Sequence, residues 1–139
     1  MSSKVFIRKA VSSEADSLAD LAFGAWERDL LPFLHGAAAS RSAERDRLAH
    51  VARDGTDAII VAELGGRPVG WCQRMPGRPY IPFLFVAPAA QNRGIGRALL
   101  RRMESLLELE GFDRVILDTL ADNVRAVNFY QHQGYHILA

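Results

Sequence analysis

The sequence predicts a single α/β domain in which helices flank a mixed, mostly antiparallel sheet. Its 139 residues suit one domain around one hydrophobic core, so residues 1–139 are treated as a single unit. Apolar residues recur at helical spacing in several segments, which predicts amphipathic helices. β-branched runs alternate with these segments, and a Gly-Gly turn joins two of the runs. This order of elements is typical of a mixed α/β fold.

The first part of the chain predicts one strand and two helices. Residues 5–7 have the composition of a short strand. Ser12, Ser13 and Asp16 then provide a capping signal for a helix. A second, highly charged helix is predicted over residues 41–52. The buried stripe predicted for the first helix consists of Leu18, Leu21, Ala22, Ala25 and Trp26.

The middle of the chain predicts a β-hairpin and a further strand. The runs at 58–62 and 69–74 flank a Gly-Gly turn at 65–66, so they are expected to pair in antiparallel fashion. Residues 81–86 predict the next strand. Pro82 has no N–H to donate to a sheet, so it belongs at the start of that strand or at a bulge.

The last part of the chain predicts two helices and two strands. A helix begins at Arg97 and ends at Gly111, where glycine is a common carboxy-terminal cap. A buried strand is predicted at 115–117, a helix at 123–133, and a short final strand at 135–138. The apolar face of the first of these helices contains Ala98, Leu99, Met103, Leu106 and Leu107.

The overall composition is that of an ordinary soluble protein. Lys and Arg number 17 against 16 Asp and Glu, a balance that argues against a nucleic-acid partner. The amino terminus lacks the apolar run of a signal peptide, and no segment has the apolar length of a membrane span, so we expect a cytoplasmic protein. The four histidines are scattered and Cys72 is the single cysteine, so no metal site is expected.

The segment Gln91–Gly96 has the features of an anion-binding turn. Two nearby glycines let consecutive N–H groups point at one place, and the helix that follows adds unpaired N–H groups and a positive dipole end. A dinucleotide fingerprint would need a small residue where Leu99 stands, and a nucleotide-triphosphatase loop would need Gly-Lys followed by Ser or Thr. A glycine-rich turn without a ligand is the alternative that these residues leave open.

Two longer motifs, one of which contains Gln91–Gly96, resemble those of a known family. Residues 84–100 read LFVAPAAQNRGIGRALL, and residues 122–135 read DNVRAVNFYQHQGY. In this order and spacing they resemble the GNAT superfamily of acyl-CoA-dependent N-acyltransferases: the first matches that family's strand, its (Arg/Gln)-x-x-Gly-x-(Gly/Ala) pyrophosphate loop and its helix start, and the second matches the elements that follow.

The resemblance implies a GNAT-like fold and a site for acetyl-CoA. The sheet would have about six strands with four flanking helices, and its central strands would splay to form the CoA cleft. Backbone N–H groups of residues 93–97 would hold the pyrophosphate, and main-chain groups near Phe85 and Val86 would pair with the pantetheine arm. The residues implied to bind the cosubstrate are Phe85, Val86, Gln91, Asn92, Arg93, Gly94, Ile95, Gly96, Arg97, Ala98, Asn123 and Tyr130.

The resemblance also implies the chemistry. An amine would attack the thioester, and Tyr130 matches the family's general acid, which would protonate the departing thiolate. The alternative for Tyr130 is an aromatic ring packed under the sheet. Asn123 matches a CoA-contacting position, and a helix-capping role is compatible with that contact. A backbone N–H near Val86 would stabilise the oxyanion.

Three arginines share one face of the helix that follows the turn. Arg93, Arg97 and Arg101 stand four residues apart, and cations in a first turn oppose the helix dipole unless an anion is near. A ligand is the favoured explanation for Arg93 and Arg97. For Arg101, pairing with Glu104 or Ser105 is an equal alternative.

The general base is not identified by the sequence. Many relatives in this family carry a carboxylate on the strand before the pyrophosphate loop, and residues 80–86 contain none. The remaining candidates are Glu63, Asp118, His35 and His50, each of which also suits a surface or core role.

We therefore expect an acetyltransferase that acts on a primary amine of a small molecule or peptide. A CoA-binding sensor or interaction module without turnover is the alternative, kept open by the missing strand carboxylate. The acceptor and the acyl-chain preference are not predicted. The sequence reaches Ala139 without the family's usual last strand, so pairing of the open edge in a homodimer is expected.

Overall fold

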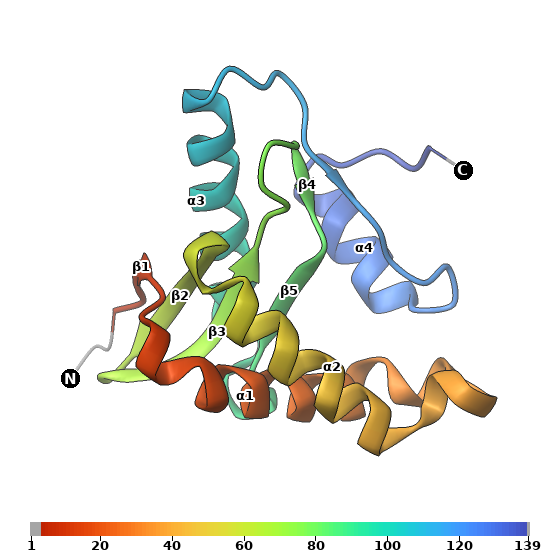
Figure 1. The fold of residues 1–139 in the computed structure, drawn as a ribbon. Coiled ribbons are helices and arrows are strands. Elements are labelled where there is room, and N and C mark those ends of the chain that lie inside the picture. The colour runs from red at the N-terminus through yellow and green to blue at the C-terminus, as the bar shows by residue number, and fades with distance from the viewer. Residues whose placement is uncertain (1–3, 139) are drawn as a thin grey trace.

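A computed structural model of the chain describes residues 4–138 and contains two sheets and four α-helices (Figure 1). The main sheet has the order β1-β2-β3-β5 with every pair antiparallel, and β4 pairs with β6 in parallel. The strands are β1 (Phe6–Lys9), β2 (Ile59–Leu64), β3 (Arg67–Gln73), β4 (Tyr80–Ile81), β5 (Phe83–Val86) and β6 (Ile116–Leu117). The helices are α1 (Ala15–Asp29), α2 (Arg41–Asp54), α3 (Ile95–Leu109) and α4 (Val124–His132).

The central hairpin follows the turn chemistry of its sequence. Gly65 and Gly66 have φ angles of 61° and 78°, so both residues of the turn occupy the left-handed region that suits a two-residue hairpin. The register shifts at Ala62 and Glu63, where a β-bulge twists β2. The predicted antiparallel pair is confirmed.

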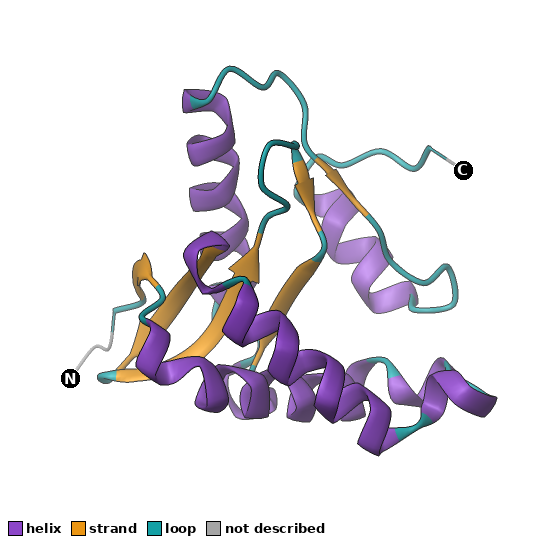
Figure 2. Cartoon of the chain, in the orientation of Figure 1, coloured by secondary structure: helices purple, strands orange, loops and turns teal. Residues whose placement is uncertain are grey.

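The main sheet is covered on both faces, which explains why its strands are apolar without strict alternation. Ile59, Val61 and Trp71 pack with α1 and α2 on one face. Ile60 and Cys72 pack with α3 on the other face. Successive strand residues point to opposite faces, so a run that is apolar throughout builds two cores. Figure 2 shows the helices on either side of the strands.

The strand predicted over residues 81–86 is divided at Pro82. Phe83–Val86 pairs with β3, whereas Tyr80 and Ile81 pair with β6. Proline has no N–H to donate, and it is tolerated here because it lies at the junction between the two ladders. The chain changes partner at this point, and the two sheets separate beyond it (Figure 1).

Near the carboxy terminus one prediction holds only in part and another is wrong. The strand expected to be buried at 115–117 is reduced to β6, and its Ile116 is 41% exposed because β6 pairs only with β4 among the described residues. Residues 135–138 form no strand, because no described strand lies alongside to pair with them. The N–H of Tyr135 instead donates to the carbonyl of Tyr130 and closes α4. Across residues 4–138, no helix is both long and apolar enough to cross a membrane.

Candidate functional site

A cleft of about 1030 Å³ lies where the two sheets separate. Its walls come from β4, β5, the amino end of α3, the carboxyl end of α1, the segment after β6, and α4. In Figure 2, β5 and β6 diverge with α4 beside them. The cleft is therefore bounded by the turn at 91–96 on one side and by α4 on the other.

The turn at residues 91–96, called the cradle below, has the backbone geometry of an anion-binding site. Asn92 and Gly94 have φ angles of 64° and 76°, and α3 begins at Ile95, two residues earlier than predicted. The first hydrogen bond inside the helix runs from Ala98 N to Gly94 O (3.0 Å). The three preceding N–H groups therefore have no carbonyl partner within α3, and they form the positive end of its dipole. Asparagine is one of the few residues other than glycine that tolerates the left-handed region.

Gly96 serves the packing of the two cleft walls. A Cβ at this position would lie 3.3 Å from Phe129 Cζ and 3.7 Å from a methyl carbon of Val86. The missing side chain thus lets Phe129 of α4 approach the first turn of α3. Gly94 has open space around it, so its requirement is the positive φ angle alone.

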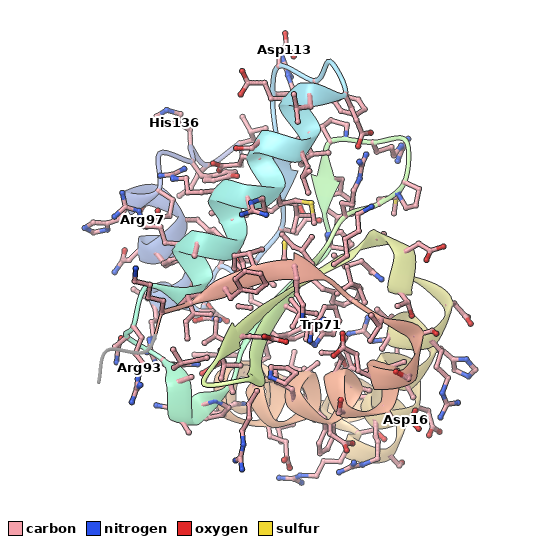
Figure 3. All side chains as sticks on the ribbon, turned by 90° about the vertical axis from the view of Figure 1, so that its left-hand side faces the viewer. Asp16, Trp71, Arg93, Arg97, Asp113 and His136 are labelled. Atoms are coloured by element: carbon pink, nitrogen blue, oxygen red, sulfur yellow. The ribbon has the colours of Figure 1, made fainter. Side chains whose placement is uncertain are left out.

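Most of the residues predicted to bind the cosubstrate line the cleft. Arg93 and Ala98 are not among its lining residues: Arg93 is exposed, and Ala98 is half-buried on α3. Figure 3 shows Arg93 and Arg97 on the same side of the molecule. The predicted residues that line the cleft are Phe85, Val86, Gln91, Asn92, Gly94, Ile95, Gly96, Arg97, Asn123 and Tyr130.

Several of these side chains have partners within the protein. Gln91 Nε2 donates to Asp29 Oδ2 (2.9 Å), so its amide points toward α1. Asn123 caps α4, because its Oδ1 accepts from Ala126 N (3.2 Å). Arg101 Nη1 donates to Glu104 Oε1 (2.8 Å), which favours the ion-pair alternative for this arginine.

Tyr130 lies in an apolar setting at the cleft wall. Its ring meets Phe129 edge-on at 5.2 Å and Tyr135 at 6.0 Å between centroids. Burial is the main cause that raises the pKa of this phenol above its ordinary value, with a smaller contribution from Cys72. The proton of the Tyr130 phenol is therefore retained to a higher pH than that of an exposed tyrosine.

Of the four candidate bases, the cleft contains one. Asp118 lines it and accepts a hydrogen bond from Tyr80 Oη (2.7 Å). Glu63 pairs with Arg8 Nε at 2.5 Å on the outer part of the sheet. His35 and His50 are not among the cleft-lining residues. The described residues contain no group of three or more His, Cys, Asp or Glu side chains placed to hold a metal ion.

A comparison with models of protein families shows to which family the chain belongs. The model of the acetyltransferase (GNAT) family matches residues 19–135, a range that includes both the cradle and Tyr130. The chain belongs to the acetyltransferase (GNAT) family. The resemblance inferred from the two motifs is thus confirmed.

Relatives of this GNAT chain include proteins of known name. Peptidyl-lysine N-acetyltransferase YiaC of Escherichia coli (strain K12) is 37% identical over 78 residues, which are 56% of this chain and 49% of that protein. A mycothiol acetyltransferase of Arthrobacter sp. (strain FB24) is 31% identical over 114 residues, with 74% of this chain and 35% of that protein covered. The chain therefore spans half or less of the length of these curated relatives.

Solved structures share the fold. The PaiA N-acetyltransferase of Thermoplasma acidophilum, crystallised in complex with coenzyme A, superimposes with a TM-score of 0.83 at 16% identity. The match covers 96% of this chain and 91% of that one. The predicted fold, a mostly antiparallel sheet with four flanking helices, is confirmed.

The sequence did not point to Asp29 as part of the cleft. Asp29 lines the cleft and meets Gln91, which lies 62 positions away in the chain. A contact between such distant residues leaves no periodicity or motif to find. Tyr80 also lines the cleft, and its hydroxyl donates a hydrogen bond to Asp118 there.

The raised pKa of Tyr130 predicts a loss of stability at high pH. An unfolded tyrosine releases its proton at a pH of about 10, whereas folded Tyr130 holds its proton beyond that point. The unfolded state then binds fewer protons than the native state, so the free energy of unfolding falls as the pH rises above about 10. Tyr130→Phe is expected to reduce this fall by up to about 1.4 kcal/mol per pH unit. Urea unfolding of the wild-type and Tyr130→Phe proteins between pH 9 and 11 measures the free energy of unfolding. Identical pH dependences in the two proteins would contradict the raised pKa of Tyr130.

Proposed function

We propose that this chain is an N-acetyltransferase that transfers the acetyl group of acetyl-CoA to a primary amine. The observation that carries the proposal is the glycine cradle at the amino end of α3, which opens into a cleft faced by the buried phenol of Tyr130. An anion site and a proton donor on opposite walls suit a phosphate-bearing thioester whose sulfur must leave as a thiol. The peptidyl-lysine and mycothiol acetyltransferases among the relatives support an amine acceptor on a peptide or small molecule.

The cradle would hold the pyrophosphate through backbone groups. The N–H groups of Ile95, Gly96 and Arg97 lack partners inside α3, and the dipole of the helix favours a negative charge there. Arg97 lines the cleft and adds a positive charge. Arg93 is exposed beside the cleft, where it would meet phosphate from the solvent side.

The pantetheine arm would lie along β5. The strand pairs with β3 on one side, and beyond Pro82 the chain pairs with β6 instead. Among the described residues, the other edge of Phe85 and Val86 therefore has no strand partner. Free main-chain groups on such an edge suit the two amides of pantetheine, as β-strand addition does for peptides.

The reaction follows from these positions. The neutral amine nitrogen forms a bond to the thioester carbonyl carbon and releases one proton to solvent, and the resulting tetrahedral oxyanion collapses as the carbon–sulfur bond breaks. Tyr130 Oη donates its proton to the departing sulfur and is later reprotonated from solvent. A backbone N–H near Val86 would stabilise the oxyanion. The products are the N-acetyl amine and CoA with a free thiol.

We further propose that Asp118 receives the proton of the acceptor. An alkylammonium has a pKa of about 10.4 and must lose a proton before it attacks. Among the candidate bases, Asp118 lines the cleft. Tyr80 Oη donates a hydrogen bond to its carboxylate and so orients it. The carboxylate would hold the ammonium by charge and pass its proton, directly or through water, to solvent.

A CoA-binding module without turnover is the second candidate. It is favoured by the absence of a carboxylate on β4 and β5, where residues 80–86 are aromatic, aliphatic or proline. Both candidates need the cradle, but only the enzyme needs Tyr130 as an acid. Turnover therefore separates them.

We also propose that residues 1–139 act as one domain in the cytoplasm and self-associate as a homodimer. Among the described residues β6 pairs only with β4, and its Ile116 is 41% exposed. An apolar strand edge of this kind favours addition of a second copy. Sedimentation at micromolar concentration is expected to give a dimer, and a strict monomer would contradict this part of the proposal.

Removal of the phenol should separate chemistry from binding. Tyr130→Phe keeps the buried ring and removes the proton donor, so kcat is expected to fall about 100-fold or more while the Kd for CoA stays within about twofold. Tyr135→Phe is the matched control, because its hydroxyl donates to Glu104 (2.6 Å) and it is not among the cleft-lining residues. Steady-state thiol release and calorimetry measure both quantities. Equal kcat values in the two variants would refute Tyr130 as the acid.

The role of Asp118 predicts a change in the pH profile. Asp118→Asn retains an acceptor for Tyr80 Oη but has no negative charge, so kcat/KM for the amine is expected to fall at least about tenfold near pH 7. The loss should shrink at higher pH, because more of the amine is then already neutral. Asp122→Asn, an exposed neighbour that is not among the cleft-lining residues, is the control. A pH–rate profile that matches the control would rule out this role.

A further inference from the structure

The carboxyl end of α1 is bonded to the segment that leads into the cradle. Arg28 Nη1 donates to the carbonyl oxygen of Pro88 (2.9 Å), and Gln91 Nε2 donates to Asp29 Oδ2 (2.9 Å). Pro88 begins the short 3-10 turn after β5, and Gln91 directly follows that turn. The last two residues of α1 thus fix both ends of the link between β5 and the cradle.

The same end of α1 also contacts the amino end of α4. Asn123 Nδ2 donates to the backbone oxygen of Asp29 at 3.5 Å, and Asn123 Oδ1 accepts from Ala126 N at 3.2 Å. Asn123 is only 7% exposed. Its amide therefore caps α4 with one atom and reaches α1 with the other. Asp29 is bonded through its side chain to the cradle and through its main chain to α4.

These contacts join two walls that are far apart along the chain. The cradle belongs to the start of α3, whereas Tyr130 belongs to α4, and the whole of α3 and β6 lies between them in the sequence. In the proposed reaction the cradle holds the cosubstrate and Tyr130 protonates its sulfur. A misplacement of about 1 Å between such groups can cost on the order of 100-fold in rate.

We propose that Asp29 is a positioning residue that holds the cradle and the amino end of α4 in register across the cleft. This inference rests on the proposed acetyl transfer. Its carboxylate accepts the Gln91 bond, and a charged acceptor makes a stronger hydrogen bond than a neutral one. The carboxylate acts through its bond to Gln91, and the backbone oxygen acts through Asn123.

The chemistry of this contact selects the variants. Asp29→Ala removes the acceptor for Gln91, whereas Asp29→Asn retains an acceptor oxygen at nearly the same place. Asp20→Ala is the matched control, because Asp20 lies on the same helix and its carboxylate faces Arg45 at 3.6 Å. Asp20 is not among the residues that line the cleft.

The experiment measures steady-state kinetics and CoA affinity of the full chain with each substitution. Asp29→Ala is expected to lower kcat about tenfold and raise the KM for acetyl-CoA about fivefold, with the acceptor KM within about twofold, since one charge-assisted hydrogen bond is lost. Asp29→Asn keeps a weaker, neutral hydrogen bond and should lie between Asp29→Ala and the wild-type chain, whereas Asp20→Ala should remain within about twofold of wild type. This pattern supports positioning through the hydrogen bond.

Other patterns overturn the proposal. Kinetics of Asp29→Ala equal to those of Asp20→Ala would show that the contact does no positioning, and Asp29→Asn as impaired as Asp29→Ala would show that the hydrogen bond is not the cause. Should Asp29→Ala fail to fold, Gln91→Ala removes the same hydrogen bond from the side of the loop. The proposal then requires that Gln91→Ala lowers kcat and raises the KM for acetyl-CoA. Unchanged kinetics of Gln91→Ala would overturn the proposal. A wild-type chain that turns over with all variants unchanged refutes this inference alone. A wild-type chain that binds no CoA refutes the proposed function as well.

Discussion

The change of strand partner at Pro82 is the constraint on which the architecture of the site depends. Phe83–Val86 pairs with β3, whereas Tyr80 and Ile81 pair with β6. A proline is tolerated at this point because it lies between the two ladders. The cleft lies in the resulting fork, with the free edge of β5 along one side and α4 along the other.

The two ends of the cleft differ in the kind of group that they present. At the cradle the protein offers backbone N–H groups, a helix dipole and Arg97, all of which favour an anion. At the opposite wall it offers a phenol that burial keeps neutral. Asp118 then supplies a negative charge where an amine would approach. Under the proposed function, one cleft would bind a phosphate ester, protonate a sulfur and receive a cation at these different places.

Local chemistry made much of this predictable from the sequence. The turn at Gly65 and Gly66, the cap at Asn123 and the cradle each depend on residues close together in the chain. The partners of β4 and β6 could not be predicted in this way, because strand pairing over long distances depends on the whole sheet. The exposure of Ile116 and the absence of a strand at 135–138 have the same origin. The contact between Asp29 and Gln91 likewise arises only when α1 packs beside β5.

Thiol release from acetyl-CoA by the wild-type chain, measured against a broad panel of primary amines beside a CoA titration, tests the central claim most directly. The account predicts saturable CoA binding and amine-dependent release of one thiol for each acetylated amine. Binding of CoA without release from any amine would contradict catalysis and favour the binding module. Absence of CoA binding would contradict the assignment of the cradle itself.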